Sequence, residues 1–236
     1  MTRLLLASAS PGRRATLRSL GIEPLVRVSG VDEDAVLAAA RERFGTLEPA
    51  DAVLVLAQAK AEAVSRSLGT ADDTGDSDAA SSAAAAASPA SDDDLVVLGC
   101  DSMLEIDGEI HGKPADAAQA TQRWRAMRGR SGVLHTGHWI VDERDGARGG
   151  TGGTLGATSS TVVHFADLTD AEIDAYVATG EPLRVAGAFT VDGRGGAFVT
   201  GIEGDYHGVV GVSLPLVREL LGQIGLTVPD LWPVVD

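Results

Sequence analysis

Cysteine, aromatic residues and long apolar runs are all scarce in this sequence of 236 residues. The single cysteine, Cys100, excludes an internal disulfide. Aromatic residues make up only 4%, so aliphatic side chains must build the core. No stretch approaches the ~20 apolar residues of a membrane span, and the leucines at 4–6 are too short a run for a signal peptide. We therefore expect a cytoplasmic protein with no membrane partner.

Positive charge is scarce as well. The chain has 19 Lys and Arg against 34 Asp and Glu, a net charge of -15. Because nucleic-acid binding depends on neutralising phosphates, we expect no nucleic-acid partner. A small anionic ligand would need local cations and backbone N–H groups to bind against this overall charge.

One segment, residues 70–94, differs in composition from the rest. It contains seven aspartates and many Ala and Ser, but no Lys or Arg. Such a composition has too little hydrophobicity to join a core. We predict a disordered insertion within a single domain that spans 1–236.

Hydrophobic spacing and turn residues predict an α/β fold with a mixed sheet, because strands and helices mix without strict alternation. The predicted strands cover 3–7, 25–28, 95–99, 133–141, 160–165 and 197–202. The predicted helices cover 11–20, 49–68, 115–127, 170–178 and 214–224, and a hairpin is expected to turn at Asp107-Gly108. Asp101 is placed just past the end of strand 95–99, where open sheets carry their active residues.

A phosphate site is predicted at the start of the first helix. Ser10-Pro11 has the pattern of an N-cap followed by the first helical residue. Free N–H groups there form a cradle for phosphate, and Ser8, Ser10, Arg13 and Arg14 add hydroxyls and cations. The alternative is an ordinary surface helix, although the helix dipole disfavours basic residues in a first turn.

Two acidic and two basic residues form a second candidate group: Glu33, Asp101, Lys60 and Lys113. A carboxylate after a buried strand can bind a divalent metal or accept a proton from water. Each residue alone is better explained as a solvated surface charge, so only the combination points to a site.

Two other patterns are interpreted as structural. His135 and His138 lie three apart on a predicted strand, so their side chains should point to opposite faces, which disfavours a shared zinc ion. The glycines at 149–156 lack the Lys-Ser/Thr ending of a P-loop and are predicted to form a plain loop.

Several segments, in order and over nearly the whole chain, resemble motifs of the Maf family. Residues 4–14, LLLASASPGRR, resemble its Leu-Ala-Ser-x-Ser-Pro-x-Arg opening. Further similarity lies in Val31-Asp32-Glu33, in 57–61 with Lys60, in 99–102, in Gly112-Lys113-Pro114, in 135–137, in 186–193 and in 202–215.

The resemblance implies a mixed, curved sheet with flanking helices and two lobes around a deep nucleotide-binding cleft, commonly in a homodimer. It also implies hydrolysis of a nucleoside triphosphate to the monophosphate and pyrophosphate with a divalent cation, Mg²⁺ or Mn²⁺. Glu33 and Asp101 would hold the metal, and Asp101 would be the proton acceptor. Phosphate-binding residues would include Ser8, Arg13, Lys60 and Lys113.

Three positions depart from the family where its branches separate their substrates. Gly12 stands where one branch has Arg and another Trp, Ser102 replaces Thr or Gln, and Asp192 replaces Gln or Glu. The branches prefer dTTP and UTP or methylated GTP, and this sequence matches neither set. Two alternatives stay open: an inosine or xanthosine triphosphatase, whose usual Thr-Gly-Asn-x-x-Lys opening is absent, and a nucleotide-sensing regulator of septation.

Overall fold

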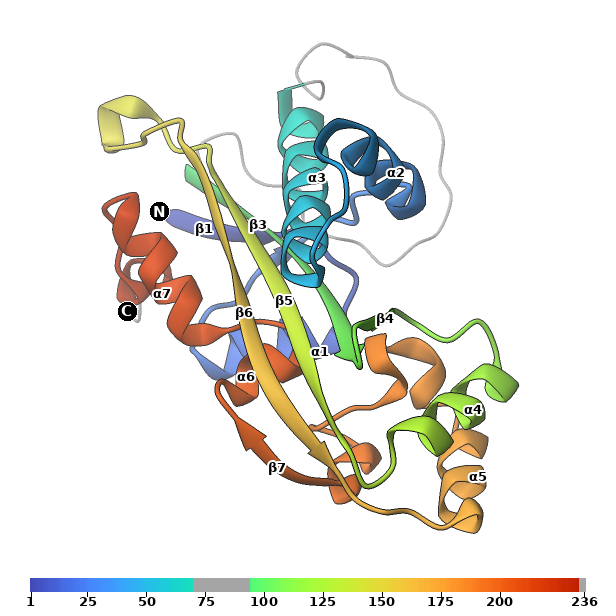
Figure 1. Ribbon diagram of the computed structural model, residues 1–236. Coiled ribbons are helices and arrows are strands. Elements are labelled where there is room, and N and C mark those ends of the chain that lie inside the picture. The colour runs from blue at the N-terminus through green and yellow to red at the C-terminus, as the bar shows by residue number, and fades with distance from the viewer. Residues whose placement is uncertain (70–93, 234–236) are drawn as a thin grey trace, which may run out of the picture.

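The computed structural model describes residues 1–69 and 94–233, and within them one mixed sheet carries the fold (Figure 1). Its strands follow the order β2-β1-β3-β5-β6-β7, with β4 paired to β3. The strands are β1 (Thr2–Leu6), β2 (Leu25–Val26), β3 (Asp94–Ile106), β4 (Glu109–His111), β5 (Ser131–Asp142), β6 (Thr154–Phe165) and β7 (Val199–Glu203). The pairs among β2, β1 and β3 are parallel, and all others are antiparallel. The predicted mixed α/β class is confirmed.

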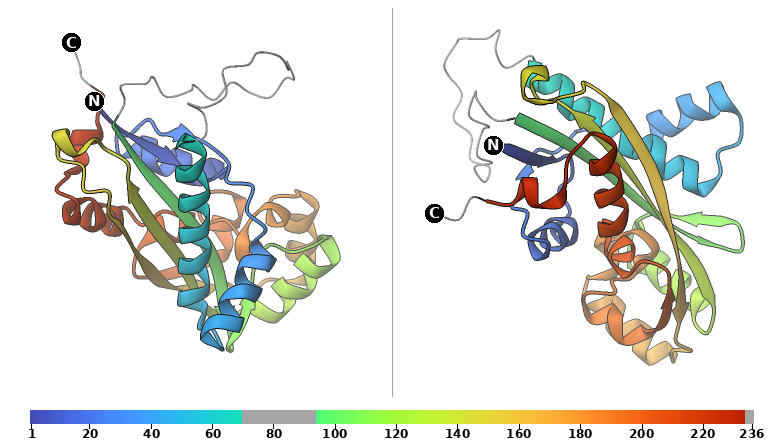
Figure 2. Two further views of the ribbon diagram at one scale, coloured as in Figure 1. Left: turned by 90° about the horizontal axis from the view of Figure 1, so that it is seen from above. Right: turned by 90° about the vertical axis from the view of Figure 1, so that its left-hand side faces the viewer.

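Helices pack on both faces and at one end of this sheet, whose long strands are strongly curved (Figure 2). The helix α3 (Pro49–Gly69) crosses one face, whereas α1 (Pro11–Ser19) and α7 (Leu214–Gln223) lie on the other. The helices α4 (Ala117–Met127) and α5 (Asp170–Ala178) lie together at one end, and α6 (Tyr206–Val210) precedes α7. Alternate residues of β3 serve the two faces: Leu98 packs with α7, and Val97 packs with α3.

The predicted end of the central strand was wrong. Strand β3 continues to Ile106, so Asp101 lies in the middle of the strand and not beyond its end. The reason is pairing: β5 runs antiparallel beside β3 from Val96 to Glu105, and this ladder holds polar residues in strand conformation. On its other side β3 pairs with β1 only as far as Leu98. Asp101 therefore lies beyond the end of β1, on a stretch of β3 that β1 leaves uncovered.

The segment predicted as an insertion overlaps this strand by one residue. Asp94 is the first residue of β3, and its carboxylate accepts a hydrogen bond from Asp145 N at 3.1 Å. The remainder, 70–93, lies outside the residues that the structure describes.

Local signals fixed several element ends as predicted. Ser10 caps α1 by accepting a hydrogen bond from Arg13 N, and Thr169 forms a capping box at α5. Asp107 and Gly108 have φ values of 54° and 80°, as a tight hairpin between β3 and β4 requires. One helix was missed: α2 (Glu33–Phe44) begins after the Asp32 N-cap.

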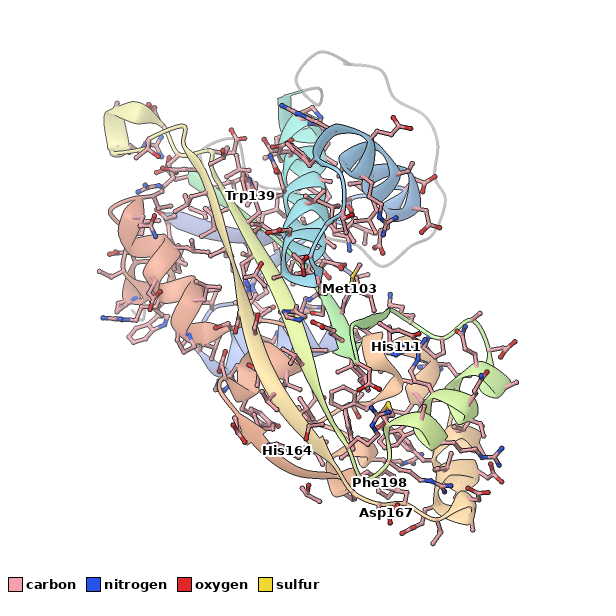
Figure 3. All side chains as sticks on the ribbon, in the orientation of Figure 1. Met103, His111, Trp139, His164, Asp167 and Phe198 are labelled. Carbon is pink, nitrogen blue, oxygen red and sulfur yellow. The ribbon has the colours of Figure 1, made fainter. Side chains whose placement is uncertain are left out.

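The helix α2 gave little signal because only Leu37 and Ala40 of its residues are buried. The two residues leave no broad apolar stripe to detect. Leu37 belongs to a buried cluster with Ala52 and Leu56 of α3, and Met103 of β3, which is labelled in Figure 3, packs against this cluster. This small cluster places the start of α2, and with it Glu33, near the middle of β3.

Two glycines let α3 approach the sheet closely. A Cβ on Gly99 would overlap the carbonyl oxygen of Ala57 and lie 2.9 Å from Ala61 Cβ. A Cβ on Gly137, which pairs directly with Asp101, would overlap the carbonyl oxygen of Val53. The helix backbone thus rests on the strand backbones, which brings Lys60 down to the level of Asp101.

Candidate active site

Three charged side chains from three elements meet on the α3 face of the sheet. Lys60 Nζ lies 2.5 Å from Asp101 Oδ1 and 2.7 Å from Glu33 Oε1. Lys60 and Asp101 are 9% and 7% exposed, whereas the Glu33 side chain is half exposed. A buried ammonium is costly without partners, and the two carboxylates supply them. The structure therefore brings together three of the four residues predicted for the acidic and basic group.

Asp101 has an unusual environment for a carboxylate. Burial raises its pKa, while the neighbouring charges of Lys60 and Arg13 oppose the rise without cancelling it. The outcome is a carboxyl group more basic than an ordinary aspartate and still held beside a cation. Such a group is suited to accept a proton from water.

Arg13 is held from three sides at the start of α1. Its Nη1 donates to Ser8 Oγ at 2.9 Å, its Nη2 donates to Ser102 Oγ at 3.1 Å, and its Nε donates to Gly211 O at 3.0 Å. A guanidinium carries five N–H donors, so these three bonds leave two for a ligand. The side chain is thus oriented in advance, with donors to spare.

Ser102 is part of the support for Arg13. Thr136 is fully buried and donates its hydroxyl hydrogen to Gly208 O at 2.8 Å. Ser102 Oγ lies 2.9 Å from Thr136 Oγ1, so Ser102 must be the donor in that pair. Thr136 is not among the site residues predicted from the sequence, and its only signal there is that it lies in 135–137, a segment that resembles a family motif.

The two other predicted cations lie apart from this cluster. Arg14 is exposed and bonds to Glu23 at 3.4 Å. It lines a surface hollow of about 300 Å³ together with Ser8 and Ser10. Lys113 is exposed beyond β4 and forms no hydrogen bond or ion pair with any residue that the structure describes. The structure therefore does not bring Lys113 into contact with the other three residues of the acidic and basic group.

The loop that carries Lys113 is nevertheless anchored. Gly112 O accepts hydrogen bonds from Arg123 Nη1 at 2.6 Å and from Gly187 N at 3.1 Å. Because Lys113 follows this fixed glycine directly, only its own side chain has to move to change what it contacts.

Gly12 and Asp192, two of the three positions that differ from the Maf family motifs, face each other. A Cβ on Gly12 would lie 3.6 Å from Asp192 Oδ2 and 3.4 Å from Val210 Cγ1. Asp192 is exposed, in the turn before η4 (Arg194–Phe198). Gly12 adjoins Arg13, so this pair lies beside the residues that could hold phosphate.

The acidic residues fit a magnesium-type cation. Among residues 1–69 and 94–233, no three His, Cys, Asp or Glu side chains converge as a metal site. Mg²⁺, however, needs only one or two carboxylates when substrate phosphates supply the remaining ligands. Glu33 and Asp101 already share one cation, the Lys60 ammonium. Their donor set therefore matches a metal that arrives with a phosphate ligand.

The two histidines of β5 have separate surroundings, as strand alternation predicts. His135 contacts Ser160 at 2.8 Å and Glu105 at 3.0 Å. His138 is buried, donates from Nδ1 to Thr136 O and accepts from Ser213 N at 2.8 Å. Burial lowers the pKa of His138 to about 4, so it stays neutral near pH 7.

In the described part of the chain, no helix has the length and apolarity needed to cross a bilayer.

This arrangement defines a class of protein: a mixed α/β fold with paired carboxylates, a buried lysine and a pre-oriented arginine, suited to water attack on a phosphate. The profile of the Maf-like protein family matches residues 3–224, and the chain belongs to this family. It is 52% identical over 230 residues to a nucleoside triphosphate pyrophosphatase of Salinispora tropica, covering 98% of this chain and 87% of that protein.

Two further relatives have the same name. The protein of Leifsonia xyli is 47% identical over 98% of this chain and 96% of its own length. The protein of Rhodococcus jostii is 50% identical over 98% of this chain and 97% of its own length. The similarity thus extends over whole chains.

Proposed function

We propose that this chain is a nucleoside triphosphate pyrophosphatase, which converts a triphosphate and water to the monophosphate and pyrophosphate. The observation that carries the proposal is the buried Asp101 held at 2.5 Å by Lys60, with Arg13 pre-oriented nearby. Relatives that are named for this activity share about half of the sequence over nearly its whole length.

In the proposed reaction, Asp101 accepts a proton from water as the water oxygen bonds to the α-phosphorus. The bond from that phosphorus to the oxygen that bridges to the β-phosphate breaks, and pyrophosphate leaves with the electron pair. Burial raises the pKa of Asp101 and makes it a stronger base than an exposed aspartate, and the charge of Lys60 partly opposes this rise. Lys60 also orients Asp101, since its ammonium joins Asp101 to Glu33.

The start of α1 is proposed to hold the phosphates. Ser8 Oγ and Ser10 Oγ accept hydrogen bonds from Arg13, so each hydroxyl keeps its own hydrogen to donate. The two unused donors of Arg13 and the helix N-terminus point to the same role. Arg14 lines the adjoining hollow, and the exposed Lys113 has a flexible stem with which to approach the outer phosphates.

We also propose that Glu33 and Asp101 hold Mg²⁺ or Mn²⁺, for which two carboxylates beside a phosphate site suffice. When bound, the cation would neutralise phosphate charge as pyrophosphate departs.

Base selection is assigned to Asp192 and Gly12. An ionised carboxylate only accepts hydrogen bonds, so Asp192 favours bases with adjacent N–H donors. Guanine offers N1–H and N2–H₂ together, whereas uracil and thymine place carbonyl oxygens on both sides of N3–H. Gly12 leaves space that Arg or Trp would fill. We infer a house-cleaning enzyme for guanine-type triphosphates, modified ones included.

Two broader features belong to the same proposal. The single cysteine suits a cytoplasmic protein that needs no disulfide. A homodimer is expected from the family resemblance, and light scattering on the purified protein would measure its mass.

Product analysis in ¹⁸O-labelled water tests the reaction directly. We expect monophosphate and pyrophosphate as products from GTP, with the label only in the monophosphate, because water attacks the α-phosphorus. Label in pyrophosphate, or release of diphosphate and inorganic phosphate, would contradict the mechanism. Binding without turnover across a panel of triphosphates would favour a nucleotide-sensing regulator, and a strong preference for ITP or XTP would favour the related triphosphatase class.

A further inference from the structure

The carboxylate of Glu181, which lies outside the predicted site, accepts several hydrogen bonds from the segment that contains Asp192. Glu181 lies between α5 and η2 (Pro182–Arg184). Its Oε1 accepts from Thr190 Oγ1 at 2.5 Å and from Gly195 N at 3.0 Å, and its Oε2 accepts from Arg194 N at 3.2 Å. We call residues 190–195 the Asp192 loop. Glu181 thus binds this loop on both sides of Asp192.

Tyr176 of α5 completes the arrangement. Its hydroxyl donates to Glu181 Oε1 at 2.9 Å and accepts from Thr190 N at 3.3 Å. The loop also lies close to the carboxylate, since a Cβ on Gly193 would be 2.9 Å from Glu181 Oε1. Backbone and side-chain donors therefore converge on one residue, which follows α5 and so belongs to a different part of the fold from Gly12 and Arg13 of α1.

The ionised form of Glu181 is the one that these donors favour. Burial alone would raise the pKa of Glu181, but the bonds from Thr190, Gly195, Tyr176 and Arg194 outweigh it and lower the pKa. The loop is consequently held by a charge-assisted network near pH 7. Tyr176 of α5 packs edge-to-face against Trp124 of α4 in a buried cluster, so this network is anchored to the hydrophobic core.

We propose that Glu181 is a positioning residue for base selection, which holds Asp192 opposite Gly12 through the Asp192 loop. The inference rests on the proposed role of Asp192 and adds the residue that fixes its place. A bidentate contact needs the acceptor held to a fraction of an ångström, and an exposed loop without Glu181 would not supply that. The residues proposed for phosphate binding and proton transfer lie on other elements of the fold. Glu181 should therefore affect which base is chosen more than it affects the chemical step.

The test is a binding comparison in the full-length protein. Dissociation constants for the α,β-methylene analogues of GTP and UTP are measured by calorimetry in wild type, Glu181→Gln and the control Glu203→Gln. Glutamine keeps the size of Glu181 but presents an NH₂ group to backbone donors. We expect the preference for the guanine analogue to fall roughly tenfold in Glu181→Gln and to stay unchanged in Glu203→Gln, whose carboxylate bonds to His164 away from the loop.

A double-mutant cycle with Asp192→Ala separates positioning from general damage. If Glu181 acts through Asp192, Glu181→Gln should not change selectivity further in the Asp192→Ala background. An equal loss of affinity for both analogues, or a full effect of Glu181→Gln without Asp192, would overturn the inference. Because the analogues are not hydrolysed, the result is independent of turnover, and a failure of the proposed reaction would be seen separately in the labelled-water experiment.

Discussion

Lys60 Nζ lies 2.5 Å from Asp101 Oδ1, and both side chains are buried against the face of the sheet that α3 covers. Their contact depends on two separate parts of the sequence. The helix α3 must present Lys60 toward the sheet, and glycines in β3 and β5 must let that helix come close. Burial favours the neutral form of Asp101, and the charge of Lys60 opposes this effect in part.

The first prediction concerns Asp101 itself. Asp101→Asn should lower kcat by about 100-fold or more, because an amide cannot accept the proton from water. The fold should persist, since asparagine has nearly the same size and Lys60 keeps Glu33 as a partner. Steady-state rates and thermal unfolding measure the two effects. Asp167→Asn, a change at an exposed aspartate, is the control and should leave the rate unchanged. If Asp101→Asn kept more than about a tenth of the wild-type rate, the assignment of Asp101 as the proton acceptor would be contradicted.

Removing the neighbouring cation should change the pH dependence. Asp101 must be ionised to act, so activity is lost as the pH falls through its pKa. Lys60 lowers that pKa, and Lys60→Met should therefore raise it further and move the acid limb of kcat/KM to higher pH. In Lys113→Met the acid limb should stay where it is in wild type, because Lys113 is exposed and unpaired within the described residues. An acid limb that does not move in Lys60→Met would mean that Asp101 is not the titrating base.

The close packing of α3 can be tested at Gly99. In Gly99→Ala the new methyl group would overlap the Ala57 carbonyl oxygen, and a backbone cannot yield as a side chain does. Overpacking of this kind costs roughly 1–3 kcal/mol or more in the free energy of unfolding. Because α3 must shift, Lys60 should also move from Asp101 and kcat should fall.

Gly222→Ala is the matched control for Gly99→Ala. Gly222 lies in α7, and nothing lies within 4 Å of the place that an added methyl group would take, so alanine there should stabilise the protein slightly. Urea unfolding gives both values. Equal stability of Gly99→Ala and wild type would show that the helix has freedom to move away.

Local signals in the sequence were sufficient for most elements and insufficient for the contacts between them. Ser10-Pro11, Asp107-Gly108 and the capping box at Thr169 act within a few residues, and each formed the predicted structure. The extent of β3 depends on its pairing with β5, which a single strand does not encode. The helix α2 is mostly exposed, so its pattern contained little to detect.

The candidate site shows the same contrast between residues that the sequence identifies and contacts that it does not. Residue types and motif spacing identified Lys60, Asp101 and Glu33, and the structure brings them together. The support of Arg13 by Ser102 and Thr136 joins a helix to two strands and could not be inferred from spacing. Arg13 and Arg14 are predicted together as cations of the first helical turn. Consecutive helical residues point in different directions, so Arg14 bonds to Glu23 and lines the adjoining hollow, whereas Arg13 contacts Ser102.

The last prediction concerns the choice of base. Asp192 Oδ2 faces the position that a side chain on Gly12 would occupy, beside the phosphate-binding start of α1. A carboxylate can accept from guanine N1–H and N2–H₂ together, but it meets two carbonyl oxygens on uracil. Wild type should therefore prefer GTP or methylated GTP over UTP and dTTP in kcat/KM. The Asp192→Gln side chain can both donate and accept hydrogen bonds, so this variant should reduce the preference for guanine. Asp167→Asn is again the control. Asp205→Asn is unsuitable for that purpose because Asp205 caps α6. A wild-type preference of roughly tenfold or more for UTP or dTTP would refute the acceptor argument, and an unchanged ranking in Asp192→Gln would place this residue away from the base.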